Sequence, residues 1–115
     1  VLRWMRTTPG LERLQGGISG MTKEEIRKLI QKNGRNNQAV ICMEECAELT
    51  QAISKHIRAS NDDRYAFINP SNLIEEMADV TICLEILKVA YNISNEELNT
   101  MIAYKEKRIR ERYEI

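Results

Sequence analysis

The chain has 115 residues, a length that predicts one domain with a modest hydrophobic core. Its 17 basic and 17 acidic residues cancel, which argues against a protein that binds nucleic acid through bulk electrostatics. No apolar run approaches the roughly 20 residues that span a bilayer, so we expect a cytoplasmic protein without membrane contact. Charge must therefore act locally in this chain.

The first 20 residues show little periodicity and hold one proline and four glycines. Met21 is followed at once by a helix start, in which Thr22 and Glu25 have the spacing of a capping box. We therefore interpret residues 1–20 as an N-terminal extension, hypothetically foreign to the natural protein. Residues 21–115 are then the functional domain.

Apolar spacing and helix start and stop signals predict four helices and no strand. The first follows Thr22, should cover the core, and ends at Asn33-Gly34, where glycine suits a left-handed cap. The other three are predicted over residues 36–58, 71–91 and 94–112. We expect an all-α fold, a small antiparallel bundle of about four helices.

The connection between the second and third helices, residues 59–71, is long and partly polar. Beside a binding site such a segment is either a lid or a plain surface loop. Its aromatic residues Tyr65 and Phe67 suit stacking on a ligand base, but anchoring the loop to the core is the commoner use of such residues.

Two acidic clusters fall on the apolar sides of the second and third helices. At about 100° per residue, Glu45 and Glu48 share an arc of roughly 60° with apolar neighbours, and Glu44 lies at its edge. On the third helix Glu76 lies near the centre of the apolar stripe, with Asp79 about 60° to one side. Carboxylates therefore stand where a core helix favours leucine.

A carboxylate in an apolar site either protonates or acquires a cation. Four oxygen ligands on two facing helices suit a hard cation such as Mg²⁺ or Mn²⁺. The alternative is that both clusters are solvated helix faces without a ligand. Their occurrence on the apolar sides of neighbouring helices favours the metal site.

The last helix carries cations on its apolar side, where Lys105 and Arg112 project with Ile102 and Ile109. Cations beside an acidic metal site indicate a bound polyanion, because phosphate needs both a metal and cationic partners. The alternative is a solvated terminal helix over residues 105–112 that frays.

The three cysteines, Cys42, Cys46 and Cys83, lack the usual spacing of metal ligands and are predicted to be small core residues in a reducing compartment. The one histidine, His56, cannot supply the paired Glu-x-x-His motifs of a di-iron bundle. We therefore expect His56 to be an exposed helix residue.

The pattern Glu44-Glu45-x-x-Glu48, 27 intervening residues and Glu76-x-x-Asp79 resembles the signature of the MazG-like all-α nucleoside triphosphate pyrophosphohydrolases, relatives of the dimeric dUTPases. The likeness covers roughly residues 38–112. It implies cleavage of a (deoxy)nucleoside triphosphate between the α- and β-phosphates, with Glu44 assisting the water. The implied Mg²⁺ ligands are Glu45, Glu48, Glu76 and Asp79.

The resemblance also extends to the last helix, where Lys105, Arg108 and Arg112 match basic positions that would bind substrate, although Ile109 replaces a frequent asparagine. It implies a homodimer or homotetramer and a house-cleaning role in the nucleotide pool. Two alternatives stay open: a dUTPase- or dCTPase-like nucleotidase with strict base preference, and a non-catalytic helical module that binds a basic partner. No residue pattern identifies the base.

Overall fold

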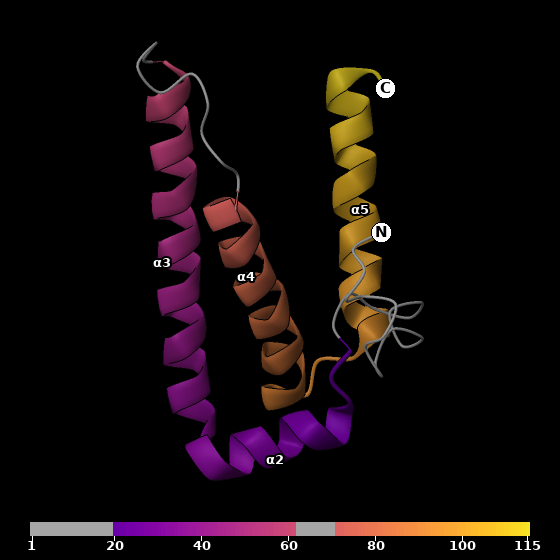
Figure 1. Ribbon diagram of the computed structural model, residues 1–115. Coiled ribbons are helices and arrows are strands. Elements are labelled where there is room, and N and C mark those ends of the chain that lie inside the picture. Colours follow the sequence, from indigo (N-terminus) through magenta and orange to yellow (C-terminus); the bar gives the residue numbers. More distant parts are fainter. Residues whose placement is uncertain (1–19, 62–70) are drawn as a thin grey trace.

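The structure, a computed structural model, describes residues 20–61 and 71–115. In these ranges the chain forms four helices and no strand: α2 (Lys23–Asn33), α3 (Arg35–Ser60), α4 (Ser71–Ala90) and α5 (Asn95–Tyr113) (Figure 1). The predicted all-α class is confirmed, and the predicted helices match within a few residues at each end. The predictions for residues 1–19, Tyr65 and Phe67 lie outside the described residues.

Helices α3 and α4 form an antiparallel hairpin, and α2 crosses its open end, where α3 begins and α4 ends (Figure 1). The buried apolar side chains come from these three helices: Ile26 of α2; Cys42, Ala52 and Ala59 of α3; Cys83, Ile86 and Ala90 of α4. The prediction that the first helix covers the core is therefore confirmed. Because most buried residues along the α3–α4 contact are small, the two helices pack closely.

The start of α2 and the turn into α3 follow local rules. The Thr22 hydroxyl accepts a hydrogen bond from the Glu25 N–H at 3.1 Å, and the Glu25 carboxylate accepts one from the Thr22 N–H at 2.9 Å. Gly34 ends α2 at φ +88° and donates to the Ile30 carbonyl at 2.7 Å. A left-handed helical cap was predicted for Gly34, but its ψ of 144° is extended, because α3 begins at the next residue.

The turn between α4 and α5 is also specified locally. Asn92 adopts a left-handed conformation at φ 54°, and the Ile93 N–H donates to the Lys88 carbonyl at 2.8 Å. The Ser94 hydroxyl then accepts a hydrogen bond from the Glu97 N–H at 3.0 Å and caps α5. The start of α5 predicted from the Ser94 and Glu97 pair is confirmed.

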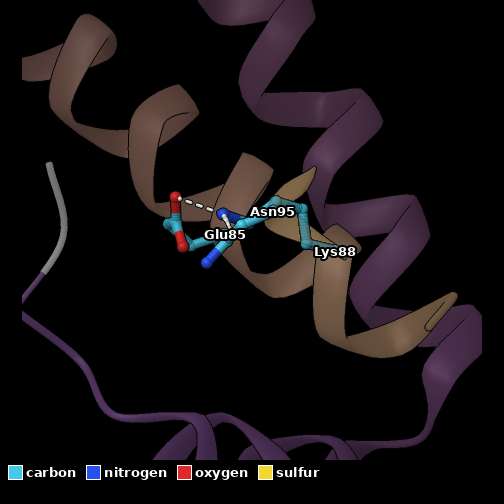
Figure 2. Close-up of polar contacts among 3 residues, drawn as sticks. All are labelled: Glu85, Lys88 and Asn95. Carbon is cyan, nitrogen blue, oxygen red and sulfur yellow. Dashed lines mark hydrogen bonds and ion pairs between the residues drawn. The ribbon is translucent and has the colours of Figure 1, made fainter. Parts of the chain in front are cut away.

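A polar contact holds the first residue of α5 against the last turns of α4. The Lys88 ammonium donates to the Asn95 side-chain oxygen at 2.6 Å and forms an ion pair with Glu85 at 3.1 Å (Figure 2). Beyond this contact α5 projects away from α3 and α4 (Figure 1). The contact of Lys88 with Asn95 thus connects the start of α5 to the end of α4.

Helix α5 contributes no buried side chain within the described chain. Its apolar residues Ile102 and Ile109 are 44% and 51% exposed. In a single chain, therefore, α3 and α4 form the antiparallel pair, α2 packs across its end, and α5, expected as the fourth member of an antiparallel bundle, packs against none of them. None of the helices that the structure describes has the length and apolarity needed to cross a membrane.

Candidate metal centre

Helices α3 and α4 bring the four predicted metal ligands together. One carboxylate oxygen from each of Glu45, Glu48, Glu76 and Asp79 lies within 4.8 Å of the others. Because the helices are antiparallel, the step of three residues from Glu45 to Glu48 on α3 matches the reverse step from Asp79 to Glu76 on α4. Glu45 thus pairs with Asp79, and Glu48 with Glu76.

The centre is partly withdrawn from water. Glu45, Glu76 and Asp79 are half-buried and Glu48 is exposed. Burial raises the pKa of Glu45, and the negative charges of Glu48 and Asp79 raise it further. Burial and then the charge of Glu48 raise the pKa of Glu76 in the same way. Without a bound cation, both carboxyl groups therefore hold a proton more readily than an ordinary glutamate does.

Two oxygen atoms of the centre lack a hydrogen-bond partner among the residues that the structure describes. They are the Oε2 atoms of Glu45 and Glu76, and both are shielded from solvent. Within the described residues, the ion pairs join Lys88 with Glu85 and Lys107 with Glu111, and none reaches the four carboxylates. Since an unpaired shielded carboxylate is costly, this all-oxygen donor set fits a hard divalent cation such as Mg²⁺ or Mn²⁺.

Glu44, predicted to assist the reacting water, lies on the exposed surface of α3 next to Glu45. It does not belong to the group of four carboxylates. Its role in assisting the water stays a prediction.

The three predicted substrate-binding cations lie together on α5. Lys105, Arg108 and Arg112 line one shallow hollow with Ile109 and Tyr113. Since α5 projects away from the α3–α4 hairpin, a single chain does not bring these cations to the acidic centre. Their role in binding substrate stays a prediction, and it requires another chain to bring the two surfaces together.

Sequence reasoning missed a different pair of cations close to the centre. Lys55 and Arg58 of α3 line a hollow that also contains Glu48 and Glu76. The signal was present, because Lys55 follows Glu48 by seven residues and therefore returns to the same side of the helix.

The cysteines divide into a buried pair and one surface thiol. Cys42 and Cys83 are buried as predicted, and the Cys42 thiol donates to the Cys83 carbonyl at 3.5 Å. Burial, followed by the neighbouring Cys42 thiol, raises the pKa of Cys83 to about 12. Cys46 is exposed, so its prediction as a core residue was wrong. It lies one turn beyond Cys42, rotated away from α4.

His56 also departs from its prediction. Instead of being exposed it is half-buried, and its shielded Nε2 atom has no hydrogen-bond partner within residues 20–61 and 71–115. The reason is its spacing from the buried residues Ala52 and Ala59, which places it on the side of α3 that faces α4.

The acidic centre combines four oxygen ligands, two unpartnered oxygens and adjacent cations. Such a site is suited to holding a divalent cation together with an anionic ligand. No protein-family model matches the chain, and neither a curated protein nor a solved structure matches it. The interpretation of the centre therefore rests on its own geometry and on the spacing of the two acidic motifs.

Proposed function

We propose that the protein is a metal-dependent nucleoside triphosphate pyrophosphohydrolase, which converts a (deoxy)nucleoside triphosphate and water into the monophosphate and pyrophosphate. The observation that carries this proposal is the convergence of four carboxylate oxygens within 4.8 Å on two packed helices. The resemblance of the motif spacing to MazG-like enzymes supports it. Removal of unwanted nucleotides from the cytoplasmic pool is the role that we assign to this activity.

The four carboxylates, Glu45, Glu48, Glu76 and Asp79, would hold Mg²⁺ or Mn²⁺. Bound there, the ion would supply positive charge to the phosphate oxygens and make water more acidic. In the reaction the water oxygen bonds to the α-phosphorus, while the bond from this phosphorus to the bridging oxygen breaks. Pyrophosphate leaves with that oxygen. We assign to Glu44 the orientation of the water or the acceptance of its proton.

We further propose that the active form is a homodimer or homotetramer. Helix α4 carries apolar residues around its whole circumference, with Ile74 and Leu84 61% and 53% exposed. Helices of this kind are normally buried on all sides. The uncovered apolar side of α5 supports the same conclusion. In such an oligomer, α5 of one chain would bring Lys105, Arg108 and Arg112 to the centre of another.

The decisive experiment is to measure release of pyrophosphate and monophosphate from a panel of ribo- and deoxynucleoside triphosphates. Each reaction is run with Mg²⁺, with Mn²⁺ and with a chelator. We expect metal-dependent release of both products, and the ranking of substrates distinguishes a broad enzyme from a dUTPase- or dCTPase-like one. Absence of turnover, together with no metal-dependent shift in Tm, would favour a non-catalytic interaction module.

A further inference from the structure

A polar hollow of about 730 Å³ adjoins the acidic centre, toward the C-terminal half of α3 and the first turns of α4. It shares the ligands Glu48 and Glu76 with the centre, and its other polar lining includes Gln51, Lys55, Arg58 and Asn72. A molecule held at the centre by a cation would therefore extend into this hollow.

The cations of the hollow follow from the helix repeat. Glu48, Gln51, Lys55 and Arg58 are separated by steps of three, four and three residues, which places them within an arc of roughly 80° on α3. Lys55 lies about 10 Å along the helix axis from Glu48. Long side chains on a helix lean toward its N-terminus, so both cations lean back toward Glu48.

Both cations are available to a ligand. Lys55 and Arg58 are exposed, and neither has an ion pair or hydrogen bond in the part of the chain that the structure describes. The N-terminal end of α4 lies at the same hollow, where Asn72 belongs to its first turn. A helix of 20 residues carries partial positive charge at this end. Three sources of positive potential therefore face one hollow.

The residues that line the hollow also indicate which part of a nucleotide the hollow would bind. Among the described residues, the hollow contains no aromatic side chain, and its apolar contribution comes from Ala52. A base normally stacks on aromatic or apolar groups, whereas phosphate oxygens need cations and amide donors. The composition therefore suits phosphate rather than a base.

We propose that this hollow binds the pyrophosphate half of the triphosphate, with Lys55 and Arg58 contacting the β- and γ-phosphates; the identity of the ligand rests on the proposed hydrolase function. The four carboxylates repel phosphate unless a cation lies between them, so phosphates directed away from the cation need positive side chains of their own. Lys55 and Arg58 supply them from the same chain as the metal ligands. These residues are substrate-binding groups for the leaving pyrophosphate.

The test measures binding of inorganic pyrophosphate and of a nucleoside monophosphate separately, by calorimetry with Mg²⁺ present. The double variant Lys55→Ala/Arg58→Ala should lose about tenfold or more in pyrophosphate affinity and keep monophosphate affinity. The charge-retaining variant Lys55→Arg/Arg58→Lys should recover most of the pyrophosphate binding. Lys28→Ala, an exposed lysine on α2, is the control and should match the unmodified protein.

Unchanged pyrophosphate affinity in the double variant would overturn the proposal, as would a loss confined to monophosphate. Absence of any pyrophosphate binding by the unmodified protein would also overturn it. The two proposals fail separately. If the protein hydrolyses no triphosphate but binds pyrophosphate through Lys55 and Arg58, the anion site stands and the hydrolase function is rejected. If it hydrolyses triphosphates but the double variant binds pyrophosphate normally, the hydrolase function stands and the anion site is rejected.

Discussion

Glu48 on α3 lies opposite Glu76 on α4, and their carboxylate oxygens belong to a set of four that lie within 4.8 Å of one another. Burial and the charge of Glu48 together raise the pKa of Glu76. A divalent cation between the two helices would replace this repulsion with attraction. Metal binding should therefore be coupled to the stability of the α3–α4 hairpin.

Replacing one carboxylate of the centre should separate metal binding from folding. In Glu45→Gln or Glu76→Gln we expect metal-dependent turnover to fall by at least about 100-fold. The Mg²⁺-dependent rise in Tm should disappear, while the metal-free variant should be at least as stable as the unmodified protein because a buried repulsion is relieved. Pyrophosphate release and thermal unfolding, each with and without Mg²⁺, measure these effects.

The matched control for these variants is Glu106→Gln, which removes an exposed carboxylate on α5. It should leave the Mg²⁺-dependent shift in Tm unchanged. Full Mg²⁺-dependent activity in Glu76→Gln would show that the ligand assignment is wrong.

The stability of the metal-free protein should depend on pH through the same carboxylates. The pKa values of Glu45 and Glu76 are raised above their ordinary 4.5, so between 4.5 and the raised values the folded chain holds protons that the unfolded chain releases. The stabilisation that these two groups contribute is fully present below pH 4.5, and it is lost as the pH rises through their pKa values in the folded chain. We therefore expect acidification from neutral pH toward 4.5 to stabilise the metal-free protein as the pH falls through the raised pKa values.

Urea unfolding in a chelator, compared between the unmodified protein and Glu45→Gln/Glu76→Gln, isolates this contribution. The double variant should gain less stability on acidification, and equal gains would contradict the prediction. Added Mg²⁺ should stabilise the unmodified protein more at the higher pH, because carboxylates bind metal in their deprotonated form.

Thiol reactivity should distinguish the surface cysteine from the buried pair. Cys46 is exposed, whereas Cys42 and Cys83 are buried and the pKa of Cys83 is raised to about 12. Thiolate is the reactive form, so Cys83 is almost entirely unreactive near neutral pH. With a chromogenic disulfide reagent, we expect one thiol to react in the folded chain and all three in denaturant. Cys46→Ser should abolish the reaction of the folded chain, and rapid labelling of all three folded thiols would refute the assignment.

The apolar side of α5 should determine the mass of the assembly. Placing a charge on it, in Ile102→Glu or Ile109→Glu, should shift the protein from an oligomer to a single chain, because a buried unpaired carboxylate opposes association. Light scattering after gel filtration measures the mass. Thr100→Glu introduces the same charge on the opposite side of α5 and should leave the mass unchanged. A single-chain mass for the unmodified protein would contradict the proposed oligomer.

Much of the fold was readable from the sequence because its signals are local. The Thr22 and Glu25 pair, Gly34 and Ser94 each mark a helix end through contacts with residues three or four positions away. The four carboxylates of the acidic centre were readable for a related reason. A spacing of three on each helix puts two carboxylates on one face, and an antiparallel hairpin is the simplest way for two such faces to meet.

Tertiary structure decided which of the apolar faces are covered. Helical periodicity shows that α5 has an apolar side, but it cannot show whether a helix of the same chain packs against it, and in the described chain none buries it. The angular position of each residue around α3, relative to the side that packs against α4, decided that Cys46 is exposed and His56 half-buried. The sequence by itself determined the helices and the acidic pairs, since both depend on residues within one turn. Only the tertiary structure decided that the cations of α5 lie away from the acidic centre, because that depends on how distant segments of the chain pack.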